Sequence, residues 1–194
     1  KVNQSTILSK SLRSFPEKWH GLKDKETRFR QRYLDLIVNP ESKKILETRS
    51  KVIKLIREYL HENSFVEVET PILQTKAGGA IAKPFTTHHN ALGLDMYLRI
   101  APELYLKRLI IGGFEKVFEL GKIFRNEGID QTHLPEFTML ESYQAYVDAN
   151  SVMDMVEDMC TYVFKNLETD TKLNFGENTA DFSGPWKRVS MFDM

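Results

Sequence analysis

Two segments between Phe124 and Tyr143 place polar and apolar side chains where they could hold a ligand together. The pattern predicts two strands joined by a loop, and strand side chains alternate between two faces. Arg125 and Glu127 then share one face, and one face of the second strand carries Phe137, Met139, Glu141 and Tyr143. At about 3.3 Å per residue, Phe137 and Glu141 lie roughly 13 Å apart. Such a face could accommodate an adenosine at one end and a small charged molecule at the other.

The mixed face also has a simpler interpretation, an amphipathic hairpin with one wet face, which is common in antiparallel sheets. Phe137 and Met139 argue against a purely solvated face, and Glu141 argues against a purely apolar one. A mixture of this kind is what a small-molecule pocket requires. The loop, with Asp130 and His133, could reach over a ligand bound on the sheet. Alternation alone leaves both interpretations open.

Helix and strand signals on the N-terminal side of the hairpin predict the elements that position it. A long amphipathic helix is expected over 41–63, with Asn39 as its cap and Pro40 at its first helical position. A strand is expected over 65–70 and must end at Pro71, which lacks the N–H that a ladder needs. Helix and strand together predict one helix packed on a sheet.

The segment leading into the hairpin is expected to be rich in loops. After a loop over 76–95, we expect a strand over 96–100 and a helix that begins at Pro102 and ends at Gly112-Gly113. The first strand of the hairpin is expected to be interrupted near Gly121.

The two ends of the chain carry weaker signals. A short strand is expected over 5–12 and a short helix over 25–36. Apolar residues at helical spacing predict a core helix over 152–167. Weak alternation over 172–191 predicts a β-hairpin whose turn lies at Ser183-Gly184-Pro185.

Composition excludes some classes of protein and favours a globular one. The 194 residues can bury a substantial core, and 27 basic residues balance 27 acidic ones, so no basic footprint indicates nucleic acid. A single cysteine, Cys160, allows no intrachain disulfide and no cysteine-based zinc site. No apolar run approaches the roughly 20 residues of a membrane span, and no signal segment begins the chain. We therefore expect a cytoplasmic protein without a membrane segment.

Several motifs in order resemble the class II aminoacyl-tRNA synthetases. Phe124-Arg125-Asn126-Glu127, a loop and His133-Leu134-Pro135-Glu136-Phe137 resemble motif 2, and the helix leading into Phe65–Pro71 resembles motif 1. Within that class the chain is similar to the lysyl-tRNA synthetases, and the further segments that carry this likeness are Gly21–Asp24, Arg30–Leu36, Gly78–Ala80, Lys83–Phe85, His88–Asn90 and Tyr97–Tyr105. One short motif would be weak evidence, whereas an ordered set is strong.

The resemblance implies a fold, a domain order and an activity. It implies an α+β catalytic domain with an antiparallel sheet flanked by helices, here incomplete. Residues 1–15 would end an upstream OB-type anticodon-binding domain, 16–38 would connect, and 39–194 would be the N-terminal part of the catalytic domain. The implied enzyme is a lysine–tRNA ligase that uses ATP, Mg²⁺, L-lysine and tRNA(Lys). The implied homodimer forms through the motif 1 helix and strand, including Pro71.

The resemblance also implies a role for each residue of the nucleotide site. Arg125 would contact the α-phosphate and the amino-acid carboxylate, where a fork that stays charged is suited to the transition state. Glu127 would touch the adenine side, His133 the outer phosphates, and Phe137 would stack under the adenine. The alternatives from the residues alone are an Arg125–Glu127 ion pair and a core position for Phe137.

Negative charge would recognise the lysine. Glu103 and Glu141 match the carboxylates of the family's lysine pocket, Tyr143 matches a hydroxyl that holds the side-chain ammonium, and Gly79 matches a backbone contact. Two carboxylates facing one pocket make sense if a substrate with two ammonium groups fills it. Glu103 alone is equally explained as a first-turn carboxylate that the helix dipole favours.

The chain departs from the family pattern at three places. Leu134 replaces a usual asparagine, and Ser64 replaces a usual glycine before the motif 1 strand. The third class motif, the magnesium carboxylates and a further pocket glutamate are not found, so we expect no metal ligand here and little activation by this segment alone. Two alternatives stay open: a paralogue that lysylates a protein, and a non-catalytic module that binds nucleotide or dimerises. An aspartate or asparagine enzyme fits less well, because it needs a cation in the side-chain pocket.

Overall fold

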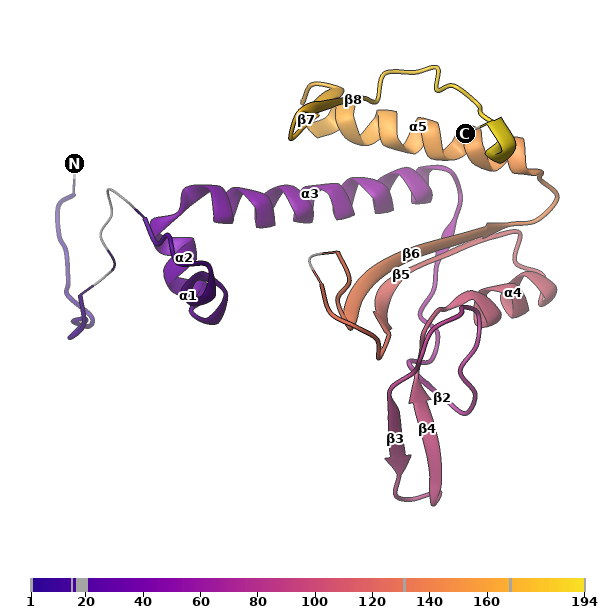
Figure 1. Ribbon diagram of the computed structural model, residues 1–194, viewed down its shortest axis with the longest axis horizontal. Helices are drawn as coiled ribbons and strands as arrows, with labels where there is room; N and C mark the ends of the chain where they lie inside the picture. The colour runs from indigo at the N-terminus through magenta and orange to yellow at the C-terminus, as the bar shows by residue number, and fades with distance from the viewer. Residues whose placement is uncertain (1, 15, 17–20, 131, 168, 194) are drawn as a thin grey trace. The chain divides into compact units, whose positions relative to one another are not determined.

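The computed structural model describes residues 2–14, 16, 21–130, 132–167 and 169–193 (Figure 1). They belong to two compact units, Lys1–Lys54 and Leu55–Met194. Each unit is described by itself below. Both contain helices, and every strand found in the described ranges belongs to the second, so the expected mixture of helices and sheets is confirmed.

The first unit is helical. Residues 2–14 contain neither helix nor strand, so the strand expected over 5–12 is wrong. The single helix expected over 25–36 is two helices, α1 (Lys25–Arg30) and α2 (Arg32–Val38), because Gln31 leaves the helical region at φ −113° and ψ 58°. The long helix α3 (Pro40–Glu62) then begins at Pro40, as expected.

A buried carboxylate holds the first unit together. Asp35 is fully buried and accepts hydrogen bonds from Arg28 Nε (2.7 Å), from Arg32 and from Asn39 Nδ2 (2.6 Å). Arg28 also donates to Ser42 (3.0 Å), which lies in the first turn of α3. The side chain of Asn39 therefore ties the end of α2 to Asp35.

The second unit begins in the last turns of α3, which end in a Schellman motif. The N–H of Phe65 donates to the carbonyl of Leu60 (2.9 Å), and the N–H of Ser64 donates to the carbonyl of His61 (3.0 Å). Ser64 has a φ of 65°, a left-handed conformation that favours glycine. The serine that departs from the family pattern therefore occupies a position where a glycine would be less strained.

The sheet that carries the hairpin has the order β1-β5-β6 and consists of β1 (Val66–Glu67), β5 (Lys116–Phe124) and β6 (Glu136–Gln144). β5 and β6 are antiparallel over their whole length, whereas β1 pairs with β5 in parallel. β1 is shorter than the strand expected over 65–70. β5 is continuous, so the interruption expected near Gly121 is wrong.

A second sheet lies between the two motifs. Its order is β2-β4-β3, with β2 (Leu73–Gln74), β3 (Thr86–His89) and β4 (Leu94–Leu98), all antiparallel. The β3–β4 hairpin occupies much of the stretch expected to be loop. Helix α4 (Glu103–Ile111) follows Pro102 and ends at Gly112, as expected.

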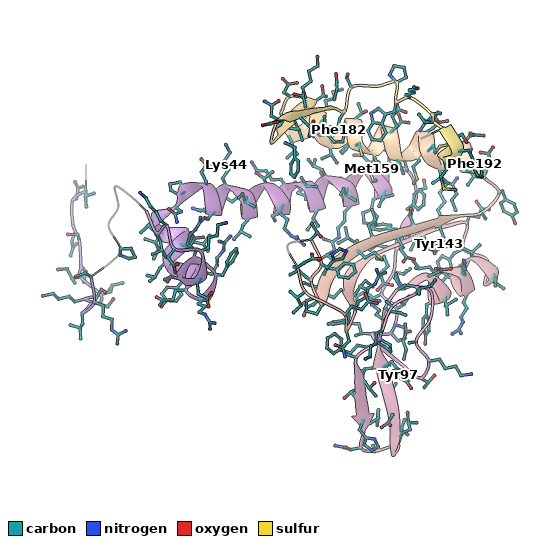
Figure 2. All side chains as sticks on the ribbon, in the orientation of Figure 1. Lys44, Tyr97, Tyr143, Met159, Phe182 and Phe192 are labelled. Atoms are coloured by element: carbon teal, nitrogen blue, oxygen red, sulfur yellow. The ribbon has the colours of Figure 1, made fainter. Side chains whose placement is uncertain are left out.

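The two faces of the β5–β6 hairpin are covered by different helices (Figure 1). The even-numbered side chains Phe118, Leu120 and Leu140 join a core cluster with Tyr59, Leu60 and Phe65 from the end of α3, and with Met155 and Met159 of α5 (Ala149–Leu167). The position of Met159, one of the residues packed against this cluster, can be found by its label in Figure 2. Helix α4 packs against β5 and β6. On the odd-numbered face Val117 and Ile123 of β5 are also buried, whereas the β6 side chains are only partly buried, so the part of this face that can receive a ligand lies on β6 and at the loop.

The chain ends in a small hairpin, β7 (Lys172–Phe175) and β8 (Asn178–Asp181), followed by a single 3-10 turn, Met191–Asp193. Its turn is at Gly176-Glu177, where Gly176 has a φ of 62°, so the turn expected at 183–185 is wrong. Trp186 donates its backbone N–H to Glu157 of α5 (2.8 Å). None of the helices in the described ranges is long and apolar enough to cross a membrane.

Candidate active site

The register of the hairpin places the expected side chains on one face. Phe137, Met139, Glu141 and Tyr143 lie opposite Ile123, Gly121, Glu119 and Val117. Directly opposed residues of an antiparallel pair project from the same face. All four of the β6 residues are partly buried, which a solvated outer face would not produce. Figure 2 shows Tyr143 between this hairpin and α4.

Arg125 and Glu127 lie just beyond the strand, because β5 ends at Phe124. The N–H of Arg125 still donates to the carbonyl of Pro135 (2.8 Å), so the ladder fixes its backbone. Its guanidinium carbon lies 5.2 Å from the centre of the Phe137 ring, within cation–π range. A weak hydrogen bond joins its Nε to the carbonyl of Ile100 (3.4 Å).

The ion pair that could have explained Arg125 is not formed. Within the described ranges no carboxylate lies within salt-bridge distance of Arg125. Glu127 accepts instead from the backbone N–H of Lys83 (3.2 Å), and Asn126 donates to the carbonyl of Lys83 (2.7 Å). Arg125 therefore keeps its charged fork for another group.

A cavity of about 310 Å³ opens at the loop end of the hairpin, and its lining residues are Arg125, Glu127, Gly128, Thr132, His133, Leu134 and Phe137. This volume lies at the lower end of the range for small-molecule sites. The cavity brings together all four residues expected to contact a nucleotide. Leu134, 60% exposed, presents an apolar side chain to it.

Asp130 organises the loop above the cavity. Its carboxylate accepts from the backbone N–H groups of Thr132 (2.7 Å) and His133 (2.8 Å), and it contacts His133 Nδ1 at 2.8 Å. The hydrogen bond from the Thr132 N–H, followed by the contact with His133, holds the pKa of Asp130 well below its usual range. His133, expected to reach the outer phosphates, is thereby fixed on an exposed turn.

The other end of the face is charged and partly buried. Tyr143 Oη donates to Glu141 Oε2 (3.1 Å). Burial raises the pKa of Glu141, and the charges of Glu103 and Glu119 raise it further, while the bond from Tyr143 opposes this. Burial and the adjacent Glu141 raise the pKa of Tyr143 as well. A carboxylate held in this way gains most from a cation placed beside it.

Gly79 and Glu103 lie in direct contact at this end. A Cβ on Gly79 would lie 3.0 Å from Glu103 Cβ and 3.2 Å from Ala101 Cβ, and Gly79 has a φ of +87°. Only glycine fits both constraints. The Glu103 carboxylate accepts from Lys107 Nζ (2.5 Å), one turn along α4. The structure thus brings Gly79, Glu103, Glu141 and Tyr143 to one end of the face.

Sequence reasoning missed a buried network on the β5 side of this face. Arg99 and Glu119 form an ion pair and are 2% and 4% exposed. Arg99 also donates to the carbonyls of Lys122 (2.8 Å) and Thr70 (3.2 Å), and the Thr70 hydroxyl donates to Glu119 (2.6 Å). The only signal for this network in the sequence was a charged residue at a position in each of two expected strands.

Pro71 lies at the surface, and the described residues offer no cluster of metal ligands. Pro71, expected at a dimer interface, is exposed after β1, and its carbonyl accepts from Gln74 Nε2 (3.2 Å). Within the described residues no group of three or more histidine, cysteine, aspartate or glutamate side chains could hold a metal ion. The residues present therefore do not fit a magnesium site, and no chemical step is derived through one.

The arrangement suits a ligand with two different ends. The loop end offers an aromatic ring, a cation and a cavity, which are suited to a nucleotide. The other end offers partly buried carboxylates and a phenol, which are suited to an ammonium group. One strand face, with Met139 between its ends, would hold both parts in line.

Comparison with known proteins shows the family of the chain. Residues 24–194 match the model of the family "tRNA synthetases class II (D, K and N)". The chain is 57% identical to a lysine–tRNA ligase of Clostridium tetani (strain Massachusetts / E88) over 192 residues, which are 99% of this chain and 38% of that protein. It is 57% identical over 192 residues to the lysine–tRNA ligase of Shewanella loihica (strain ATCC BAA-1088 / PV-4), with the same coverage of both proteins. It is 56% identical to that of Prochlorococcus marinus subsp. pastoris (strain CCMP1986 / NIES-2087 / MED4), covering 100% of this chain and 38% of the relative.

The chain spans only 38% of the length of these relatives, so their names describe proteins much longer than this chain. The family match, by contrast, covers most of this chain and includes the hairpin, its loop and α4. The chain therefore belongs to the class II tRNA synthetases of the D, K and N group.

Proposed function

We propose that the protein is a lysine–tRNA ligase that activates lysine with ATP and transfers it to tRNA(Lys). The observation that carries the proposal is the single strand face with Phe137 and Arg125 at one end and the Glu141–Tyr143 pair at the other. The high identity to lysine–tRNA ligases supports it.

The first step forms the adenylate. An oxygen of the lysine carboxylate attacks the α-phosphorus of ATP in line, the bond to the β-phosphate oxygen breaks, and pyrophosphate leaves. No covalent nucleophile is needed, so the residues act by positioning and by charge. Arg125, which has no carboxylate partner in the described residues, is placed to bind α-phosphate and amino-acid carboxylate together. Phe137 would support the adenine, while Glu127 and His133 line the same cavity.

Charge at the other end selects the amino acid. Glu141 and Glu103 would take the ammonium groups, with Tyr143 orienting Glu141 and the backbone of Gly79 beside Glu103. An aspartate would place its carboxylate against two others, and an asparagine, which has only its α-ammonium, would leave one of them without a countercharge. The second step, attack of a tRNA hydroxyl on the carbonyl carbon with release of AMP, uses the same positioned carbonyl.

The wider parts of the proposal follow the family. We propose a cytoplasmic homodimer that associates through α3 and β1 near Pro71, with Mg²⁺ accompanying the ATP. Residues 1–15 would be the end of an OB-type domain, 16–38 a connector, and 39–194 part of the catalytic domain. The matched region 24–194 supports the last of these.

The test is lysine-dependent ATP–pyrophosphate exchange by the full-length protein, with each of the other amino acids compared. We expect exchange with lysine and not with aspartate or asparagine, followed by charging of tRNA(Lys). Exchange with lysine but transfer to a protein and not to tRNA would favour the paralogue that lysylates a protein. Nucleotide binding without exchange for any amino acid would favour a non-catalytic module and contradict the proposal.

A further inference from the structure

A buried cation lies on the same face of the hairpin that is proposed to bind a cation. The Arg99 guanidinium is so close to the hairpin that a Cβ on Gly121 would come within 2.3 Å of its NH2 atom. Gly121 lies in the middle of the site face, opposite Met139. This explains why β5 carries a glycine there without any interruption of the strand.

Arg99 is held in place for structural reasons. Its donors reach two other segments: the stretch after β1 at Thr70, and strand β5 at both Glu119 and the carbonyl of Lys122. A positive charge fixed there would repel an ammonium group on the same face. In a poorly solvated site that repulsion is much stronger than in water.

Glu119 forms an ion pair with this cation and lies on the face of the proposed lysine site. It is directly opposite Glu141 in the ladder, so the two Cβ atoms are about 5 Å apart. Glu119 is buried and forms its ion pair with Arg99, while Glu141 has Tyr143 as its hydrogen-bond partner. The two opposed carboxylates therefore have different partners.

We propose that Glu119 is a specificity-determining residue, because it cancels the charge of Arg99 directly beside Glu141 and so leaves Glu141 to bind the side-chain ammonium of lysine. The inference rests on the proposed function. Glu119 does not need to touch the substrate; it sets the charge of the floor on which the substrate lies. The net charge of the pair is then zero only when both members are present or both are absent.

The experiment compares Glu119→Gln with the double variant R99Q/E119Q in the full-length protein. Glu119→Gln keeps the shape and loses the charge, so the Michaelis constant for lysine should rise about tenfold while that for ATP stays within about twofold. The double variant removes both charges, and its Michaelis constant for lysine should return to within about threefold of the wild type. Glu177→Gln, the same change at an exposed turn of the β7–β8 hairpin, serves as the control and should change neither constant.

Norleucine, which is lysine without the side-chain ammonium, separates charge from distortion. Its inhibition constant against lysine-dependent exchange should be unchanged in Glu119→Gln, so the preference for lysine over norleucine falls about tenfold. A distorted site would weaken the binding of both lysine and norleucine and would lower kcat. Equal losses for lysine and norleucine would therefore overturn the inference.

The double variant keeps the test decisive if Glu119→Gln folds poorly with Arg99 unpaired. A preference for lysine that drops about tenfold in R99Q/E119Q would overturn the inference, because no net charge has been removed. A wild-type protein without lysine-dependent exchange would overturn the proposed function and the inference together. An active wild type whose Glu119→Gln variant keeps its preference would overturn the inference alone.

Discussion

The two ends of the β5–β6 hairpin present their side chains in opposite ways. At the loop end the groups are exposed or open to a cavity, and backbone contacts fix them: Arg125 through Pro135, Glu127 through Lys83, and His133 through Asp130. At the other end Glu141 is partly buried and meets other charged side chains on neighbouring elements.

Each end depends on a different physical effect. A nucleotide is large and flat, so an end that binds it can rely on shape and on a few directed groups. A lysine side chain differs from an apolar one mainly in charge, so an end that binds it must rely on electrostatics in a poorly hydrated place. Substitutions at the two ends should therefore change different kinetic constants.

The largest effect is expected from Arg125→Ala. Its guanidinium would stabilise the charge that develops on the α-phosphate, and removal of one such group should lower kcat for ATP–pyrophosphate exchange by about 100- to 1,000-fold. Arg125→Lys should lie between, because it keeps the charge and loses the fork. Arg30→Ala, at an exposed arginine of α1, is the matched control. A loss below tenfold in Arg125→Ala would mean that this arginine does not contact the reacting phosphate.

Glu141→Gln should act on lysine alone. Loss of the charge that faces the ammonium should raise the Michaelis constant for lysine about 30-fold or more, since breaking a desolvated charge pair costs at least ~2 kcal/mol. The Michaelis constant for ATP should stay unchanged. Steady-state exchange measures both constants when lysine is varied at fixed ATP and ATP is varied at fixed lysine. Equal rises in the two constants would show that the two ends do not act separately.

Sequence alone predicted the site face because β6 is a regular strand. Alternation is enough to place Phe137, Met139, Glu141 and Tyr143 together, and the register agrees. The ends of elements were less certain: Arg125 was expected within the strand and lies just after it, where Pro135 still pairs with it.

The contacts between distant segments could not be predicted from the sequence. A glycine in a strand indicated an interruption at Gly121, whereas the structure uses it to admit the Arg99 side chain from another segment. Thr70, Arg99 and Glu119 are far apart in sequence and meet only after folding. Nothing local indicated that Glu119 would be buried, because its countercharge lies beyond any helical or strand period.

The same Glu141→Gln variant should be more stable than the wild type at neutral pH. Burial raises the pKa of Glu141, so the folded state disfavours its ionised form. The stability of the wild type relative to the variant is therefore greatest below the pKa that a glutamate has in the unfolded chain. It decreases as pH rises through the pKa of Glu141 in the folded state. Thermal unfolding without ligand should give a higher Tm for the variant at pH 7 and no advantage near pH 3. A lower Tm at pH 7 would show that Glu141 is already stabilised by the protein.

Phe137→Leu sharpens the contrast at the loop end. The change keeps an apolar side chain and removes the ring that faces Arg125 and the cavity. Loss of stacking should raise the Michaelis constant for ATP about three- to tenfold, and that for lysine should not change. Phe175→Leu, at an exposed position of β7, is the control. A rise in the Michaelis constant for lysine instead would mean that Phe137 acts in lysine binding and not in nucleotide binding.

The smallest effect is expected from Asp130→Ala, which removes the acceptor for the N–H groups of Thr132 and His133 and the contact with His133 Nδ1. The loop would then lose its turn but keep its anchors at Arg125 and Pro135. Each of these exposed hydrogen bonds contributes little net free energy, so the Michaelis constant for ATP should rise only about two- to fourfold. Asp130→Asn, which keeps a side-chain oxygen, should lose less, and lysine binding should be unaffected in both. If Asp130→Ala raised the Michaelis constant for lysine as much as that for ATP, the loop would act on both ends of the face. The two ends would then form one pocket whose parts cannot be changed separately.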